Sequence, residues 1–169
     1  MSTIRGVALP RGVVGGHRCG MKNIDPLLSP ERVLATDDDL ADLLSRLLER
    51  ANMRQVWVIM LGADDRVTGP LLPLEDYPSD PDAECDTADL GTLTHSRLLA
   101  ARFAAFSEMC DAERIVLVWE RRGSSALRAG DLAWARAMAR DCREAGVALR
   151  AQFVLHDRGL RTIAVDDLL

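Results

Sequence analysis

The residues that could do chemistry cluster in one stretch of the chain, from Trp119 to Asp131. A short apolar run ends there in charged residues, which are followed by a glycine and two serines. Guanidinium groups beside the free N–H groups of a helix N-terminus can bind a phosphate, a carboxylate tail or an acidic peptide. The candidate ligand-binding residues are therefore Trp119, Arg121, Arg122, Ser124, Ser125, Arg128 and Asp131.

The same residues permit two other interpretations. In the first, the loop is solvated and its arginines pair with Glu120, Asp131 or a nearby acidic segment, and we favour this interpretation. In the second, Ser124 or Ser125 is a nucleophile activated by an imidazole. The chain has three imidazoles, those of His17, His95 and His156. No G-x-S-x-G sequence surrounds either serine, so we assign no catalytic residue.

The elements around this stretch place it at the end of a buried strand. Residues Ile115 to Trp119 are apolar throughout, which predicts a strand covered on both faces. A helical pattern then runs from Asp131 to Ala145 and ends at Gly146. Ligands of α/β proteins bind where a strand passes into a helix, outside the carboxyl end of the strand.

The rest of the chain adds further helices and strands. Apolar residues at helical spacing predict a helix from Asp37 to Ala51, with Thr36 as its N-cap, and another from Thr94 to Ala112. The predicted strands form two hairpins, Gln55–Leu61 with Val67–Leu74 and Val147–Leu155 with Leu160–Val165. This order predicts an α/β (α+β) fold, in which helices flank a mixed central β-sheet.

The length of 169 residues suits one domain. We expect an irregular N-terminal segment over residues 1–30, with a possible strand at Ile4–Leu9 and a turn at Gly15–Gly16, and a single domain over residues 31–169. Residues 75–91 are rich in acids and contain two prolines, which predicts a flexible acidic loop. We interpret it as a solvated loop and not as a metal site, because it lacks the spacing and central glycine of a calcium loop.

Composition and charge exclude several classes of protein. The chain is 48% apolar and 28% charged, which is typical of a soluble globular domain, and its net charge of -5 argues against general nucleic-acid binding. We find no signal peptide in Met1–Gly20 and no run long enough to span a membrane, so we expect a cytoplasmic protein. The four cysteines form no C-x-x-C pair. Lys22 is the single lysine among 21 basic residues, which indicates a GC-rich bacterial genome.

From Arg54 onward, the order of elements resembles the JAB/MPN (JAMM) fold, in particular its bacterial RadC-type branch. The matching pieces are the hairpin at Val56–Leu61 and Asp64–Val67, the helix that ends near Ala112, and the strand at Ile115–Val118. Two further pieces complete the match: the helix that begins at Asp131, and the final strands at Val147–Asp157 and beyond. Active members of that family carry H-x-H-P, followed by a serine and an aspartate. Two imidazoles and the carboxylate hold a zinc ion, which lowers the pKa of its bound water.

This chain departs from the family's zinc motif at most of its positions. Trp119 and Arg121 stand where the two imidazoles should be, and Arg122 replaces the proline. The serine position falls on Arg128 or Ala129, which leaves Asp131 as the matching carboxylate. The resemblance therefore implies a family member without the family's metal chemistry, with no cofactor and no metal.

We thus expect a catalytically inactive RadC/JAB-like domain that binds a protein, a second copy of itself or a small anionic ligand. The alternative is a hydrolase of altered, metal-independent chemistry that acts on an anionic substrate through the arginines and serines of residues 121–128. A third possibility is a small regulator whose acidic loop, residues 75–91, docks onto a basic partner.

Overall fold

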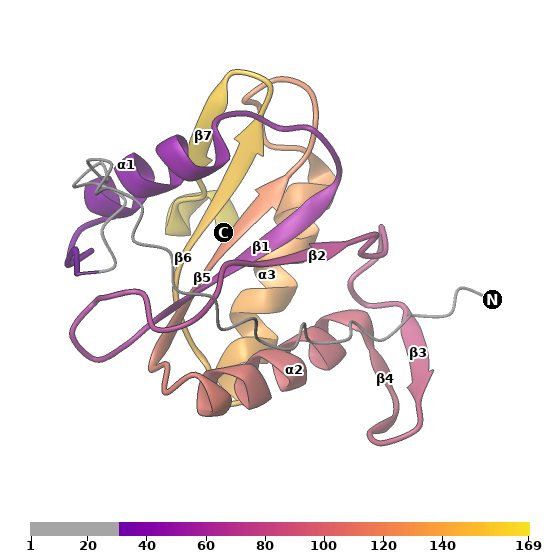
Figure 1. The fold of residues 1–169 in the computed structure, drawn as a ribbon. Helices are drawn as coiled ribbons and strands as arrows, with labels where there is room; N and C mark the ends of the chain where they lie inside the picture. The colour runs from indigo at the N-terminus through magenta and orange to yellow at the C-terminus, as the bar shows by residue number, and fades with distance from the viewer. Residues whose placement is uncertain (1–30) are drawn as a thin grey trace, which may run out of the picture.

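The computed structural model describes residues 31–169. The strand predicted at Ile4–Leu9, the turn predicted at Gly15–Gly16 and the imidazole of His17 lie outside the described part. The described chain folds as a single mixed α/β domain, as predicted (Figure 1). Its main sheet has five strands in the order β2-β1-β5-β6-β7. A separate two-stranded sheet pairs β3 with β4.

The strands of the main sheet are β1 (Gln55–Leu61), β2 (Leu72–Glu75), β5 (Arg114–Glu120), β6 (Ala148–His156) and β7 (Gly159–Thr162). Strand β5 pairs antiparallel with β1 and parallel with β6, which makes the sheet mixed. The parallel pair requires a crossover, and α3 (Ala129–Glu144) provides it. Strand β2 is one edge of the sheet, and its Pro73 lies opposite Trp57 of β1.

Helices cover both faces of the sheet, which explains why the central strands are apolar throughout. α1 (Asp37–Leu48) packs its leucines on one face, against residues such as Ile59, Val116 and Phe153. α2 (His95–Met109) and α3 pack on the other face, against residues such as Val58 and Leu117. Figure 1 shows α1 on one side of the sheet and α2 and α3 on the other. Neighbouring residues of β1 and β5 thus face two different cores.

The helix boundaries follow local capping chemistry. Thr36 caps α1 as predicted: its hydroxyl accepts the N–H of Asp39, and the Asp39 carboxylate accepts the N–H of Thr36 in return. The helix ends at Leu48, three residues before the predicted end at Ala51. Gly146 stands just beyond the end of α3 with φ of 73°, a conformation that favours glycine.

Two strand predictions need correction. The second strand of the first hairpin, predicted over Val67–Leu74, is confined to β2, and Val67 forms only an isolated bridge with Leu61. The segment predicted as an acidic loop contains β3 (Glu84–Thr87), which pairs with β4 (Gly91–Thr94). Its side chains alternate between exposed and half-buried, so the acids stand on the solvent side of a strand.

Across residues 31–169, none of the helices combines the length and the apolar character that crossing a membrane requires.

Candidate functional site

The predicted site lies at the carboxyl ends of the parallel strands β5 and β6; we call this end of the sheet the site edge. Strand β5 ends at Glu120, and eight residues then lead to the first residue of α3, Ala129. Strand β6 ends at His156 beside it, and the N–H of Asp157 donates to the carbonyl of Gly123 at 3.2 Å. The candidate residues are thus gathered at one edge, although they do not all point to one place.

Arg121 and Asp131 form a buried ion pair at the centre of this loop. Nε of Arg121 lies 3.1 and 3.0 Å from the two oxygens of Asp131, and Nη2 lies 2.7 Å from Oδ2. The two side chains are 6% and 8% exposed. Nη1 and Nη2 also donate to the carbonyls of Ser124 and Ala126. The guanidinium of Arg121 is therefore engaged by its own loop and does not face an open binding site.

Asp131 also organises the start of α3. It is the third residue of the helix, and its Oδ2 accepts the N–H of Arg128 at 2.8 Å. A carboxylate at this position caps free N–H groups and lies at the positive end of the helix dipole. Asp131 thus has a structural role in this chain.

The remaining arginines brace the same loop through backbone carbonyls. Nη2 of Arg128 donates to the carbonyl of Arg122 at 3.0 Å, and Nε of Arg122 donates to the carbonyl of Asn52 at 3.0 Å. Arg161 donates to the carbonyl of Ser125 at 3.0 Å. The side chains of Arg122 and Arg128 nevertheless belong to exposed residues, unlike that of Arg121.

Neither serine is placed as an activated nucleophile. Ser124 is exposed and Ser125 half-buried, and their contacts with Arg121 and Arg161 use backbone carbonyls. Within residues 31–169, neither imidazole bonds to a serine hydroxyl of this loop. Nδ1 of His156 instead accepts the N–H of Arg158, and burial, followed by the positive charges of Arg121 and Arg158, lowers the pKa of His156.

Trp119 is part of an aromatic cluster beneath the loop. Its ring centroid lies 5.3 Å from that of Tyr77 and 5.5 Å from that of Trp134, and Tyr77 lies 5.4 Å from Trp134. Nε1 of Trp119 donates to Oε1 of Gln152 at 3.0 Å. Since Trp119 is 1% exposed, it is a core residue and offers no surface to a ligand in this conformation.

Tyr77 is not evident as a site residue from the sequence, because it lies within the acidic segment. The guanidinium carbon of Arg54 lies 3.7 Å from the centroid of its ring, and Arg54 also donates to the carbonyls of Tyr77 and Pro78. Nε1 of Trp134 donates to the carbonyl of Pro78 at 2.9 Å. These contacts fasten the start of the acidic segment onto the body of the domain.

Glu120, at the end of β5, carries a buried carboxylate. From the sequence, Glu120 is expected only as an ion-pair partner of the loop arginines. It is 2% exposed, yet its carboxylate has no ion pair among the described residues. It accepts hydrogen bonds from the N–H groups of Asn52 and Met53, from Nε2 of Gln55 and from Nε1 of Trp57. Burial alone would raise the pKa of Glu120, but these neutral donors outweigh that effect and lower it.

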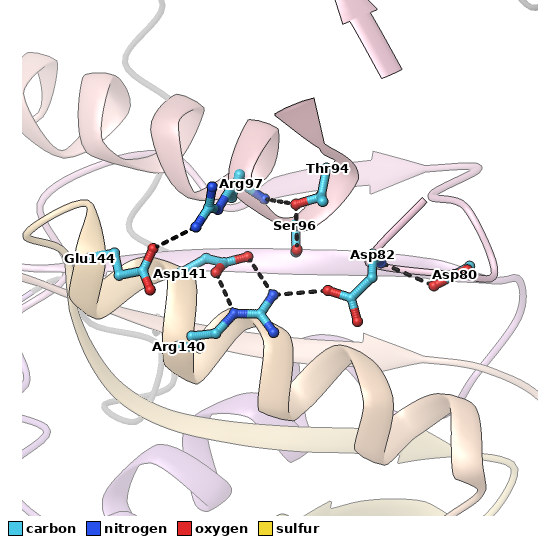
Figure 2. Close-up of polar contacts among 8 residues, drawn as sticks. All are labelled: Asp80, Asp82, Thr94, Ser96, Arg97, Arg140, Asp141 and Glu144. Carbon is cyan, nitrogen blue, oxygen red and sulfur yellow. Dashed lines mark hydrogen bonds and ion pairs between the residues drawn. The ribbon is translucent and has the colours of Figure 1, made fainter. Parts of the chain in front are cut away.

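Charged side chains tie the acidic segment to α3, and α2 to α3 (Figure 2). Arg140 of α3 contacts Asp82 at 2.9 Å and the buried Asp141 at 2.7 Å, and Arg97 of α2 contacts Glu144 at 3.1 Å. Burial of Asp141 opposes ionisation, whereas hydrogen bonds from Arg140 and Ser96 favour it, and the net effect lowers the pKa of Asp141. These acids pair with arginines and are not arranged as metal ligands.

The residues at this edge do not fit a zinc ion. Trp119 and Arg121 present an indole and a guanidinium, which are not zinc ligands, and the Asp131 oxygens are occupied by Arg121 and Arg128. Among residues 31–169, no group of three or more His, Cys, Asp or Glu side chains is close enough to hold a metal ion. These side chains therefore do not support a metal-dependent reaction at this position.

A shallow pocket of about 220 Å³ lies elsewhere, between the end of α2 and the turn from α3 into β6. Its lining includes Ser107, Glu108, Asp111 and Gly146, and none of the candidate residues. Trp119 and Arg121 thus do not contribute to this pocket.

Comparison of the chain with models of known protein families finds no match, and comparison with curated proteins finds none either.

Proposed function

We propose that the chain is a catalytically inactive RadC-like domain of the JAB/MPN type that acts as a protein- or ligand-binding module. The proposal rests on the order of elements in the sequence and on one observation, the buried Arg121–Asp131 pair. In an active member of that family, the aspartate at this position would be a zinc ligand. Here the same carboxylate is bound by a guanidinium that belongs to its own loop.

Electrostatics explains why this exchange favours binding over metal-dependent catalysis. A guanidinium is positively charged at every physiological pH, and it already satisfies the charge of the carboxylate. A divalent cation would have to displace Arg121 and leave it buried without a partner, which costs several kcal/mol. Placing the protein in the cytoplasm is part of the same proposal and agrees with Cys85, Cys110 and Cys142 being free thiols.

The alternative, a metal-independent hydrolase, receives less support. It requires Arg121 to stabilise developing negative charge on a substrate, but Nε, Nη1 and Nη2 of Arg121 already donate within the loop. It also requires an activated serine, and the contacts of Ser124 and Ser125 are made by their carbonyls.

The test is metal analysis and native mass spectrometry of the purified full chain after exposure to excess zinc and removal of free metal. We expect no stoichiometric zinc. Stoichiometric zinc that is lost in Asp131→Ala but kept in Asp157→Ala, an exposed carboxylate at the same edge, would overturn the proposal. Ester or phosphomonoester hydrolysis abolished by Ser124→Ala or Ser125→Ala would establish the hydrolase instead.

A further inference from the structure

Two exposed patches of opposite charge lie side by side at the edge of the sheet described above. The basic patch consists of Arg122, Arg128 and Arg158, and the acidic patch consists of Glu75, Asp76 and Asp80. Gln55 of β1 is paired with Glu75 on one side and with Glu120 on the other, so β2 and β5 end at the same level. Neighbouring strands are about 4.8 Å apart, so these two ends are separated by roughly 10 Å.

The arginines of the basic patch surround one short loop. Arg128 donates to the carbonyl of Arg122, and the residue before Arg158 donates to the carbonyl of Gly123. None of the three arginines forms an ion pair with a carboxylate of residues 31–169. The net positive potential here also acts on His156, whose pKa is lowered by burial and then by Arg121 and Arg158, against the opposing effect of Asp157.

The acidic patch is held in place by its neighbours. Tyr77 lies between Asp76 and Asp80, and its ring is fixed by Trp119, Trp134 and Arg54. The ring of Tyr77 contacts Trp119 near the end of β5, so the acidic patch lies beside the strand that leads into the loop of the basic patch. Glu75, Asp76 and Asp80 form no ion pair with any described residue, and the nearby Arg54 is stacked on Tyr77.

Adjacent patches of opposite sign are self-complementary under a two-fold axis. A second copy rotated by half a turn places its acids against the arginines of the first, and its arginines against the acids of the first. The matched charges act at short range, whereas the repulsion expected from the net charge of -5 is weakened, because charges further apart than about 10 Å are screened at 0.1 M salt. We infer that this edge is an interface between two copies of the chain, formed by the acidic patch of one against the basic patch of the other. The inference deepens the binding role proposed above by naming the partner.

The test measures the oligomeric state of the full chain by sedimentation at low and high ionic strength. We expect a dimer at low salt that dissociates at high salt. Two double variants, R122E/R158E and E75K/D76K, each reverse two of the three charges of one patch, and each alone should be monomeric. An equimolar mixture of the two should restore a dimer, because each changed patch then faces its complement. The control R97E/R143E alters two exposed arginines outside both patches and should leave the dimer unchanged.

Restoration in the mixture also shows that both variants are folded. A wild-type chain that stays monomeric at low salt, or a dimer that neither double variant affects, would overturn the inference. Wild-type monomers that bind polyglutamate through Arg122 and Arg158 would show an acidic partner protein as the occupant and would also overturn it. These outcomes leave the proposed function standing, since that proposal fails on stoichiometric zinc at Asp131 and not on the oligomeric state.

Discussion

Arg121 and Asp131 face each other across the loop between β5 and α3, with Nη2 and Oδ2 at 2.7 Å and both side chains almost fully buried. Ten residues separate them in the sequence, and each also holds the backbone between them: Arg121 through the carbonyls of Ser124 and Ala126, Asp131 through the N–H of Arg128. The pair therefore joins the two ends of the loop, and Arg122, Arg128 and Arg161 hold the loop further.

Removal of one member of this pair should destabilise the protein strongly. Arg121→Leu or Asp131→Leu leaves a buried charge without its partner, and we expect each to lower the free energy of unfolding by about 3–5 kcal/mol. The double variant should lose less than the sum of the two single variants, because no isolated charge remains. Urea denaturation of the wild type, the two single variants and the double variant gives the double-mutant cycle. Additive losses would show that the pair contributes no coupling energy.

Glu120 should make stability dependent on acid. The folded-state pKa of Glu120 is below its ordinary value of 4.5, so its contribution to stability is complete above that value and is lost as the pH falls through the folded-state pKa. Glu120→Gln places an NH2 group among donors that need an acceptor, and we expect it to cost about 1–3 kcal/mol at pH 7. The difference from wild type should shrink progressively below pH 4.5 in urea denaturation. A difference that is constant with pH would contradict the lowered pKa.

Gly123 should not tolerate a side chain. Its φ is 113°, a backbone conformation that strains any L side chain, so we expect Gly123→Ala to cost about 1–3 kcal/mol; the Cβ would also displace the flexible end of the Arg128 side chain. Gly130, in the first turn of α3, has open space where a Cβ would lie, with no neighbouring atom within 4 Å, and is the matched control. Gly130→Ala should be neutral or stabilising by up to about 1 kcal/mol, because alanine favours helix. Thermal unfolding of both variants compares them; equal effects would contradict the strain at Gly123.

The thiol of Cys142 should be inert in the folded protein. It is fully buried, and burial, with a smaller effect from Asp141, raises its pKa to about 12. Alkylation with iodoacetamide followed by peptide mass spectrometry should modify the half-buried Cys110 before Cys142, which should react only on unfolding. Labelling of Cys142 at the rate of Cys110 under native conditions would show that the α3 face of the core opens.

The parts of the fold that the sequence predicts correctly are those in which local pattern and tertiary burial agree. Strand β1 has the predicted bounds, Gln55–Leu61, because both of its faces are buried and its sequence is almost uniformly apolar. The start of α1 is predictable from Thr36 and the acids after it. The hairpin of β3 and β4 escapes prediction because its acids resemble those of a solvated loop. It is held by contacts beyond any local pattern, such as the paired contacts of Asp89 with Arg102 of α2.

The chemistry of the candidate site is predictable only in part. Pairing of the loop arginines with Asp131 is one of the interpretations that the sequence leaves open, and Arg121 does form that pair. The partners of Glu120 stand 63 to 68 residues away from it, and Tyr77 meets Trp119 from a distant part of the chain. Such contacts depend on β5 lying next to β1, on the side away from β2. The hairpin pattern predicts the pairing of β1 with the strand that follows it, but no local sequence signal specifies the position of β5.

Pro73, in the four-residue edge strand β2, has a consequence for how copies of this protein can meet. A proline offers no N–H, so an incoming strand would find a short and incomplete ladder of donors. Addition of strands from further copies at β2, which would extend the sheet into a fibre, is therefore disfavoured. Copies that associate along β2 have to do so through side-chain contacts.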